Sequence, residues 1–100
     1  MDITVQQLKE KIDNKAACVI IDVREPWENE EFNVGGQLIP LNDLMGKVAD
    51  LEAHKNDEVV VYCRSGNRSG MAKQILQSAG FANVRNLIGG MMHWQDVYKG

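Results

Sequence analysis

The chain has 100 residues, of which 44% are hydrophobic and 25% are charged, and its formal net charge is −3. These values are typical of one soluble domain with one core, and two cysteines are too few for a disulfide framework. The acidic balance argues against a surface for nucleic acid or for an anionic membrane. No apolar run approaches the roughly 20 residues that a membrane-spanning helix needs. Residues 1–4 lack the basic and apolar regions of a secretory signal, and we expect a cytoplasmic monomer.

The first half of the chain alternates between helical and strand patterns. Thr4 and Gln7 fit a capping box, and the apolar spacing that follows predicts a helix over residues 4–14. The β-branched run over residues 18–23, which shows no polar alternation, predicts a strand that is covered on both faces. The next predicted elements are a short helix over residues 27–32, a short strand over residues 37–39 and a helix over residues 41–51. Asn42 is the candidate cap of that last helix, and its predicted apolar face comprises Leu41, Leu44, Met45, Val48 and Leu51.

The second half contains the most apolar strand, predicted over residues 59–62. It leads directly into a polar loop over residues 63–69. The remaining predicted elements are a helix with an apolar stripe over residues 71–79, a short strand over residues 84–87 and a last helix over residues 91–97. Helices that alternate with continuously apolar strands predict an α/β architecture, with a mostly parallel sheet between helical layers. Ligands of such sheets bind beyond the carboxyl ends of the strands, where Cys63 lies.

The loop over residues 63–69 reads Cys-Arg-Ser-Gly-Asn-Arg-Ser. Successive N–H groups of a tight loop, together with the N-terminus of the following helix, attract an anion and stabilise a thiolate. Arg64 and Arg68 add positive charge, and Gly66 permits the positive φ that a tight loop requires. We therefore interpret Cys63 as a nucleophile in an anion pocket. The alternative, a small buried hydrophobe, explains the cysteine but not the polar loop around it.

Three segments, in this order along the chain, resemble the rhodanese (sulfurtransferase) family. Residues 21–28 (Ile-Asp-Val-Arg-Glu-Pro-Trp-Glu) resemble its N-terminal signature, residues 63–69 its active-site loop, and residues 84–94, with Asn-Leu-Ile-Gly-Gly, its C-terminal signature. The resemblance implies a rhodanese-like α/β fold of about five strands, with helices on both faces, in one domain over residues 1–100. Residues 33–40 depart from the family's Gly-His-Ile-Pro-Gly-Ala-like segment, because they are fewer and lack the histidine.

The resemblance also implies an activity, the ping-pong transfer of a sulfane sulfur through a persulfide on Cys63. The implied donor is thiosulfate, and the acceptor is cyanide or a thiol, which a protein could carry; no cofactor or metal is expected. The loop residues that would surround the sulfur are Arg64, Ser65, Gly66, Asn67, Arg68 and Ser69. Within this set, Arg64 is the candidate contact to the anionic donor, and Arg68 is expected to brace the loop. Asp22 and Arg24 are expected to support the site structurally.

Other readings of the same loop remain open. A cysteine phosphatase loop has the form Cys-x5-Arg, whereas here the arginine comes one residue early and Ser69 stands in its place. Tyr62 also replaces the histidine that usually precedes a phosphatase cysteine. A thioredoxin-like reductase would need a Cys-x-x-Cys motif. A rhodanese-like domain can also act as an interaction module or as a sulfur relay that depends on a partner, and the retained Cys63 argues only against an inactive module.

The remaining polar and sulfur-containing residues receive structural interpretations. Cys18, at the start of a strand, is interpreted as packing. His54 and His93 lack neighbours of ligand type, and Trp94 is expected to anchor the last helix in the core. The acidic group Glu25, Glu28, Glu30 and Glu31 is interpreted as a solvated helix face. Core positions are expected for Met71, Met91 and Met92.

Overall fold

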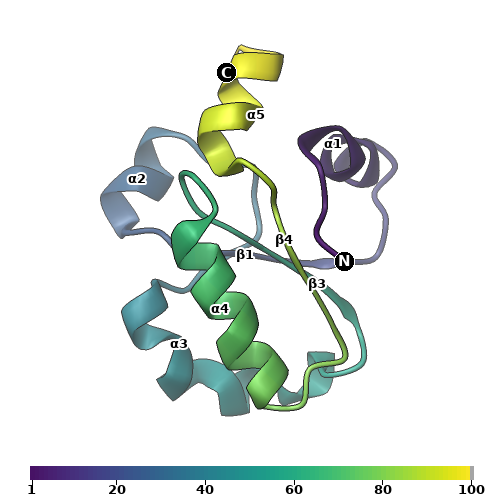
Figure 1. Ribbon diagram of the computed structural model, residues 1–100, viewed down its shortest axis with the longest axis vertical. Helices are drawn as coiled ribbons and strands as arrows, with labels where there is room; N and C mark the ends of the chain where they lie inside the picture. Colours follow the sequence, from purple (N-terminus) through teal and green to yellow (C-terminus); the bar gives the residue numbers. More distant parts are fainter. Residues whose placement is uncertain (100) are drawn as a thin grey trace.

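The computed structural model describes residues 1–99, and in it helices and strands follow one another along the chain (Figure 1). The elements are α1 (Val5–Asp13), β1 (Val19–Asp22), α2 (Pro26–Glu31), β2 (Gln37–Leu38), α3 (Leu41–Lys47), the 3-10 segment η1 (Val48–His54), β3 (Glu58–Tyr62), α4 (Asn67–Ser78), β4 (Asn83–Asn86) and α5 (Gly90–Tyr98). The capping box predicted at Thr4 and Gln7 is confirmed, since each side chain accepts from the other residue's backbone N–H. The helix predicted over residues 41–51 divides into α3 and η1.

The sheet has four parallel strands in the order β2-β1-β3-β4. About five strands were expected, and the difference lies at the N-terminus. There, Ile3 makes only an isolated parallel bridge to Leu87 beyond β4. A single bridge adds one pairing to the edge of the sheet without forming a strand.

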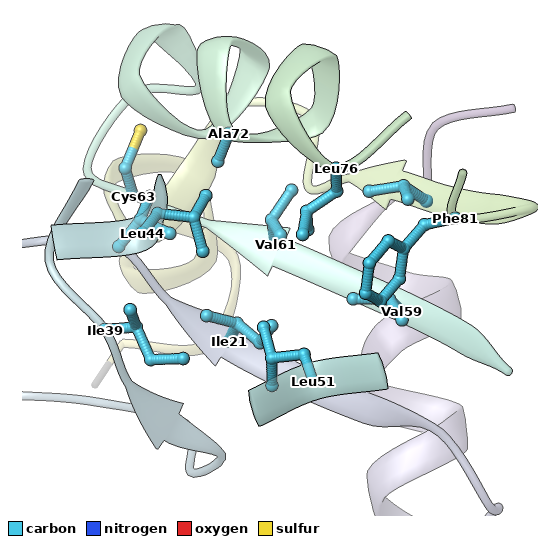
Figure 2. Packing of buried hydrophobic residues seen from close by; sticks show 12 residues of the cluster. Ile21, Ile39, Leu44, Leu51, Val59, Val61, Cys63, Ala72, Leu76 and Phe81 are labelled. Atoms are coloured by element: carbon cyan, nitrogen blue, oxygen red, sulfur yellow. The ribbon is translucent and has the colours of Figure 1, made fainter. Parts of the chain in front are cut away.

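The helices cover both faces of the sheet, as the continuously apolar strands predict (Figure 1). One core lies under α3, η1 and α4, and the other lies under α1 and α5. Because side chains alternate along a strand, Val59, Val61 and Cys63 share the face under α4 (Figure 2). Val60 and Tyr62 belong to the opposite core. The alternation of side chains along β3 therefore directs Cys63 toward α4, the helix that follows it.

Several predictions of capping and burial are wrong. The residue before the first turn of α3 is Pro40, so Asn42 lies inside the helix and does not cap it. Met45 is 75% exposed, because it lies about 100° around the helix from buried Leu44. Met71 and Met92 are also exposed rather than packed in the core. Met91 and Trp94 are buried, as expected. No helix within residues 1–99 is long and apolar enough to span a membrane.

Candidate active site

The carboxyl ends of β1 and β3 meet at the centre of the sheet, where Asp22 is the register partner of Tyr62. The chain leaves β1 toward β2 on one side and leaves β3 toward β4 on the other. In parallel sheets this reversal opens the crevice in which ligands bind. Cys63 follows Tyr62 directly, so its sulfur lies at this position.

The sulfur of Cys63 accepts hydrogen bonds from the start of α4. The N–H groups of Gly66 and Ser69 lie 3.1 Å and 3.4 Å from Sγ, and the Ser69 hydroxyl lies 3.3 Å from it. Asn67 begins α4, which places the helix N-terminus and its partial positive charge at the sulfur. α4 thus begins inside the predicted loop, and its polar first turn has no apolar residue to signal a helix.

These contacts favour the thiolate. Burial by itself would raise the pKa of Cys63, but donation from the Ser69 hydroxyl and from the backbone N–H groups of Ser69, Gly66 and Ser65 outweighs it. The pKa of Cys63 therefore lies below its ordinary value. A cysteine that is both buried and activated in this way differs from a structural core cysteine.

Glycines allow the surrounding backbone to approach the loop. Gly66, directly before α4, has a φ of +109°, a conformation that few other residues adopt. A Cβ on Gly90 would lie 2.5 Å from the carbonyl oxygens of both Cys63 and Arg64. Because Gly90 has no side chain, the first N–H groups of α5 donate to those carbonyls, Met91 to Cys63 and Met92 to Arg64, each at 2.9 Å. The Gly-Gly pair thus packs α5 onto the backbone of Cys63 and Arg64.

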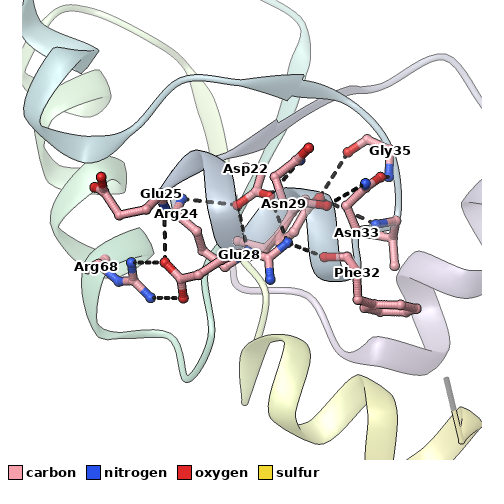
Figure 3. A network of polar contacts seen from close by, with 11 residues as sticks. Asp22, Arg24, Glu25, Glu28, Asn29, Phe32, Asn33, Gly35 and Arg68 are labelled. Carbon is pink, nitrogen blue, oxygen red and sulfur yellow. Dashed lines mark hydrogen bonds and ion pairs between the residues drawn. The ribbon is translucent and has the colours of Figure 1, made fainter.

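Arg68 makes a bidentate ion pair with Glu28 of α2 (Figure 3). Its Nη1 and Nη2 lie 2.7 Å and 2.9 Å from the two carboxylate oxygens. Hydrogen bonding from Arg68 lowers the pKa of Glu28 to about 2, against the opposing effect of burial. The interpretation of Glu28 as part of a solvated face is therefore wrong. Glu25, Glu30 and Glu31 are exposed, as expected.

Asp22 and Arg24 form a second pair, deeper in the protein (Figure 3). Asp22 is fully buried, and its two oxygens accept from Arg24 Nε and Nη2 at 2.9 Å and 2.8 Å. Asn29 also donates to Asp22, and Arg24 donates to the Phe32 carbonyl, so the pair ties the middle and the C-terminal end of α2 to the end of β1. The Arg24 guanidinium lies 5.4 Å from the centroid of the Tyr62 ring. Among the described residues, the donors to the Cys63 sulfur are Gly66 and Ser69, and Arg24 is not one of them.

Tyr62 anchors the segment over residues 33–40 that departs from the family pattern. Its hydroxyl donates to the Gly35 carbonyl at 3.0 Å and accepts from the N–H of Val34 at 3.4 Å. Gly36 packs directly on β1, where a Cβ would lie 2.2 Å from the Ile20 carbonyl oxygen. The shorter segment therefore still reaches the sheet and contributes β2.

A cleft of about 420 Å³ lies beside the loop. Its lining residues are Arg24, Trp27, Glu28, Glu31, Phe32, Arg64, Met91, Met92 and Gln95. Within residues 1–99, Arg64 has no ion pair, unlike Arg24 and Arg68. Arg64 is exposed at the cleft, and it is the loop cation that is free to meet an anion.

The structure places most of the sequence-predicted loop residues around the sulfur, where they make different contacts. Gly66 and Ser69 donate to Sγ, Arg68 braces the loop, and Arg64 faces the cleft. Ser65 and Asn67 present exposed side chains. Across residues 1–99, no three His, Cys, Asp or Glu side chains are grouped as metal ligands would be.

Two further residues of the site were missed by the sequence interpretation. Glu28 was assigned to a solvated face, although its place three residues after Glu25 fits the capping contact it makes with the Glu25 N–H. Asn86, at the end of β4, donates through Nδ2 to the Gly66 carbonyl and contacts the Ser69 hydroxyl through Oδ1. A polar residue at the carboxyl end of a parallel strand was the available signal for Asn86.

Comparison with known proteins agrees with this geometry. The rhodanese-like domain family model matches residues 4–97. The putative sulfur carrier protein YrkF of Bacillus subtilis is 35% identical over 94 residues, which are 93% of this chain and 50% of YrkF. The thiosulfate sulfurtransferase PspE of Escherichia coli is 42% identical over 67 residues, which are 66% of this chain and 64% of PspE.

Among solved structures, a rhodanese-related protein from Thermoplasma volcanium matches with a TM-score of 0.83 and 31% identity, over 97% of this chain and 92% of that chain. The chain spans half of the length of YrkF and 64% of the length of PspE. The match to the family model extends over almost the whole chain and includes the loop that holds Cys63. The chain therefore belongs to the rhodanese-like domain family of sulfurtransferases and their relatives.

Proposed function

We propose that the protein transfers a sulfane sulfur through a persulfide on Cys63. The observation that carries this proposal is the group of donors around the Cys63 sulfur: two backbone N–H groups and one hydroxyl, all within 3.4 Å. The backbone N–H groups among these donors, which stabilise the thiolate, can also stabilise an anionic persulfide. The PspE name, thiosulfate sulfurtransferase, supports thiosulfate as the donor.

In the first half-reaction, the Cys63 thiolate attacks the outer sulfur of thiosulfate. A bond forms between Sγ and that sulfur, and the bond to the sulfonate breaks, so that sulfite leaves with the electron pair. In the second half-reaction, cyanide or a thiolate attacks the outer sulfur of the persulfide. The product is thiocyanate or a new persulfide, and the Cys63 thiolate is regenerated. No net proton, oxidant or metal is needed in either step.

The two loop arginines have different parts in this proposal. Arg68 is neutralised by Glu28, so its contribution is to hold the first turn of α4 in place. Arg64 is the charge that meets the anionic donor, because it is exposed at the cleft and has no counter-ion among the described residues. The first-turn N–H groups of Asn67 and Arg68 have no partner within the helix and are available to the outer sulfur.

The cleft is the proposed site of the organic acceptor. A volume of about 420 Å³ falls in the range of sites for organic ligands, which is larger than a small inorganic anion requires. Trp27 and Met92 offer exposed apolar surface to the body of a thiol. Arg64 and Glu31 supply opposite charges at the same cleft. This combination supports a thiol on a peptide or protein more than it supports cyanide.

The direct test is the mass of the protein after incubation with thiosulfate. The native chain is expected to gain one sulfur atom, which addition of a thiol removes again. Cys63→Ser is expected to show no gain, and Cys18→Ser is the matched control that retains it. An equal gain in Cys63→Ser would contradict the proposal. Loading without turnover to any small thiol or to cyanide would instead identify a relay that requires a protein partner.

A second test separates binding of the donor from integrity of the loop. Arg64→Ala is expected to weaken thiosulfate use by about tenfold or more, because a charge-assisted contact is lost. Its thermal unfolding is expected to stay close to that of the native protein, because Arg64 makes no ion pair with any residue of 1–99. Unchanged turnover in Arg64→Ala would remove Arg64 from the donor site.

A further inference from the structure

The hydroxyl of Ser69 faces two acceptors at once. Its Oγ lies 3.3 Å from the Cys63 sulfur and 2.5 Å from Oδ1 of Asn86. A serine hydroxyl carries one proton, so it can donate to only one of them at a time. The choice matters because donation to the sulfur stabilises the thiolate.

The orientation of the Asn86 amide decides which atom faces Ser69. Its Nδ2 donates to the Gly66 carbonyl at 3.1 Å. In the flipped orientation, Oδ1 would face that carbonyl, and two acceptors would repel each other. Gly66 therefore holds the amide with its oxygen toward Ser69. Among the described residues, Ser69 is the one side chain that donates to Oδ1 of Asn86.

We propose that Asn86 is a positioning residue that competes with Cys63 for the Ser69 proton. When Cys63 is a thiol, the Ser69 hydroxyl donates to Asn86, and its oxygen can accept the S–H proton. When Cys63 is a thiolate, the hydroxyl turns to the sulfur and leaves Oδ1 without a donor. An unpaired, half-buried acceptor is costly, so Asn86 opposes the thiolate and favours the states in which Sγ carries no charge.

The inference rests on the proposed function only in taking Cys63 as the nucleophile. In the persulfide the negative charge moves to the outer sulfur, so Sγ needs the Ser69 proton less. The hydroxyl then returns to Asn86, which stabilises the loaded form relative to the free thiolate. Asn86 would thus favour the persulfide over the free thiolate, and it would also lower the fraction of unloaded Cys63 that is a thiolate.

The charged groups around the sulfur lie on several elements. They include Arg64 in the loop, Arg68 on α4 and Glu28 on α2, which neutralises Arg68. Asp2, which pairs with Lys73 of α4, accepts from the backbone N–H of Asn86. β4 contributes the uncharged Asn86, and α5 contributes backbone N–H groups. The test leaves all of these charged residues unchanged, so a difference between variants does not arise from their removal.

The experiment measures the rate of alkylation of Cys63 by iodoacetamide as a function of pH, in a Cys18→Ser background. The variants are Asn86→Leu, which keeps the volume without either hydrogen bond, Ser69→Ala, and the double variant. Asn86→Leu is expected to lower the pKa of Cys63 by about 0.5, because Ser69 then donates to the sulfur without competition. Ser69→Ala is expected to raise it, and Asn86→Leu is expected to have no further effect in the Ser69→Ala background.

A purely structural Asn86 predicts the opposite result. Loss of the contact to Gly66 would loosen the loop, raise the pKa of Cys63 and do so whether or not Ser69 is present. That outcome overturns the proposal. Because alkylation needs no sulfur donor, failure of this test is distinct from failure of the proposed sulfur transfer.

Discussion

The two cysteines lie at opposite ends of neighbouring strands and have opposite chemistry. Cys63 follows the carboxyl end of β3, where the N–H groups of a helix begin, and its pKa is lowered. Cys18 precedes the amino end of β1, where burial and the negative charge of Glu58 raise its pKa. Cys18 is also the more exposed of the two. The direction of each pKa shift therefore follows the end of the strand on which the thiol lies, and we expect the less exposed Cys63 to be the more reactive of the two.

The reason is the polarity of the parallel βα unit. Every strand of this sheet runs in the same direction, and the helix after a strand begins at the strand's carboxyl end. Unpaired N–H groups therefore gather at that end. A cysteine at the amino end meets no such donors, and Cys18 meets the side chain of Glu58 instead.

The largest expected effect comes from separating α5 from the backbone of Cys63. Gly90→Ala places a methyl group 2.5 Å from the carbonyl oxygens of Cys63 and Arg64, which forces the helix or the loop to move. We expect a loss of about 2 kcal/mol or more in the free energy of unfolding and a loss of sulfur loading. Chemical denaturation and mass measurement after thiosulfate check these outcomes.

The matched control is Gly46→Ala, in the exposed part of α3. A Cβ there meets nothing within 4 Å, and alanine favours a helix by up to about 1 kcal/mol over glycine. This variant is expected to load sulfur normally and to be slightly more stable. Normal loading in Gly90→Ala would mean that the packing of α5 is not required at the site.

The difference in alkylation rate between the two cysteines should also depend on pH. The pKa of Cys63 is lowered and that of Cys18 is raised. The alkylation rate of Cys63 divided by that of Cys18 should therefore be highest in acid. It should fall as the pH rises through the pKa of Cys63, since Cys18 then continues to gain thiolate. Differences in access do not change with pH in a stable fold. Peptide mapping by mass spectrometry measures the ratio, and a ratio independent of pH would contradict the contrast.

A smaller effect is expected from the ion pair that braces the cysteine loop. The ion pair lowers the pKa of Glu28 from its ordinary value of 4.5 to about 2, so the stabilisation is complete above pH 4.5. It is lost as the pH falls from 4.5 toward 2, where the folded protein takes up the proton. Glu28→Gln is expected to lower the free energy of unfolding by about 1–2 kcal/mol at pH 7, since Arg68 is partly solvated.

The same comparison at lower pH makes the test specific. The difference between Glu28→Gln and the native chain should disappear near pH 2, because a protonated glutamate resembles glutamine. Glu31→Gln, at an exposed position of the same helix, is expected to change the stability by less than about 0.5 kcal/mol. A difference that persists unchanged into acid would show that the charge of Glu28 is not the cause.

The smallest expected effect concerns the surroundings of Cys18. Glu58→Gln removes the negative charge that raises the pKa of this thiol and leaves Lys11 and Arg85, which lower it. The pKa of Cys18 should fall, and that of Cys63 should stay where it is. The two ion pairs lost with Glu58 are expected to reduce stability by about 0.5–1 kcal/mol. An unchanged alkylation profile at Cys18 would mean that burial alone sets its pKa.

Much of the fold and the position of the candidate site could be predicted from the sequence. Continuous apolar strands predict a parallel sheet covered on both faces, and the polar loop over residues 63–69 marks the carboxyl end of β3. The cradle around Cys63 follows from local order along the chain, since Gly66 and Ser69 lie within six residues of it. Hydrogen bonds between residues that are this close along the chain can be predicted from the sequence.

The partners of this loop could not be predicted in the same way. Glu28 lies 40 residues from Arg68, and Asn86 lies 17 residues from Ser69, so no periodicity links the members of either pair. The exposure of Met45 and Met71 was also unpredictable. The spacing of apolar residues along a helix does not determine how many of them the sheet will bury.

By itself, the sequence determined the class of fold, and it predicted that the candidate site lies at the carboxyl end of β3, with Cys63 at its centre. Spacing along the chain is sufficient for these features, because they depend on neighbouring residues and on the direction of parallel strands. Only the tertiary structure decided which arginine remains free, since Glu28 is brought to Arg68 and not to Arg64. It alone placed Asn86 against Ser69, because contacts between distant segments arise from packing of the whole sheet. The two cysteines noted at the outset as too few for a framework thus acquire their different chemistry from the fold.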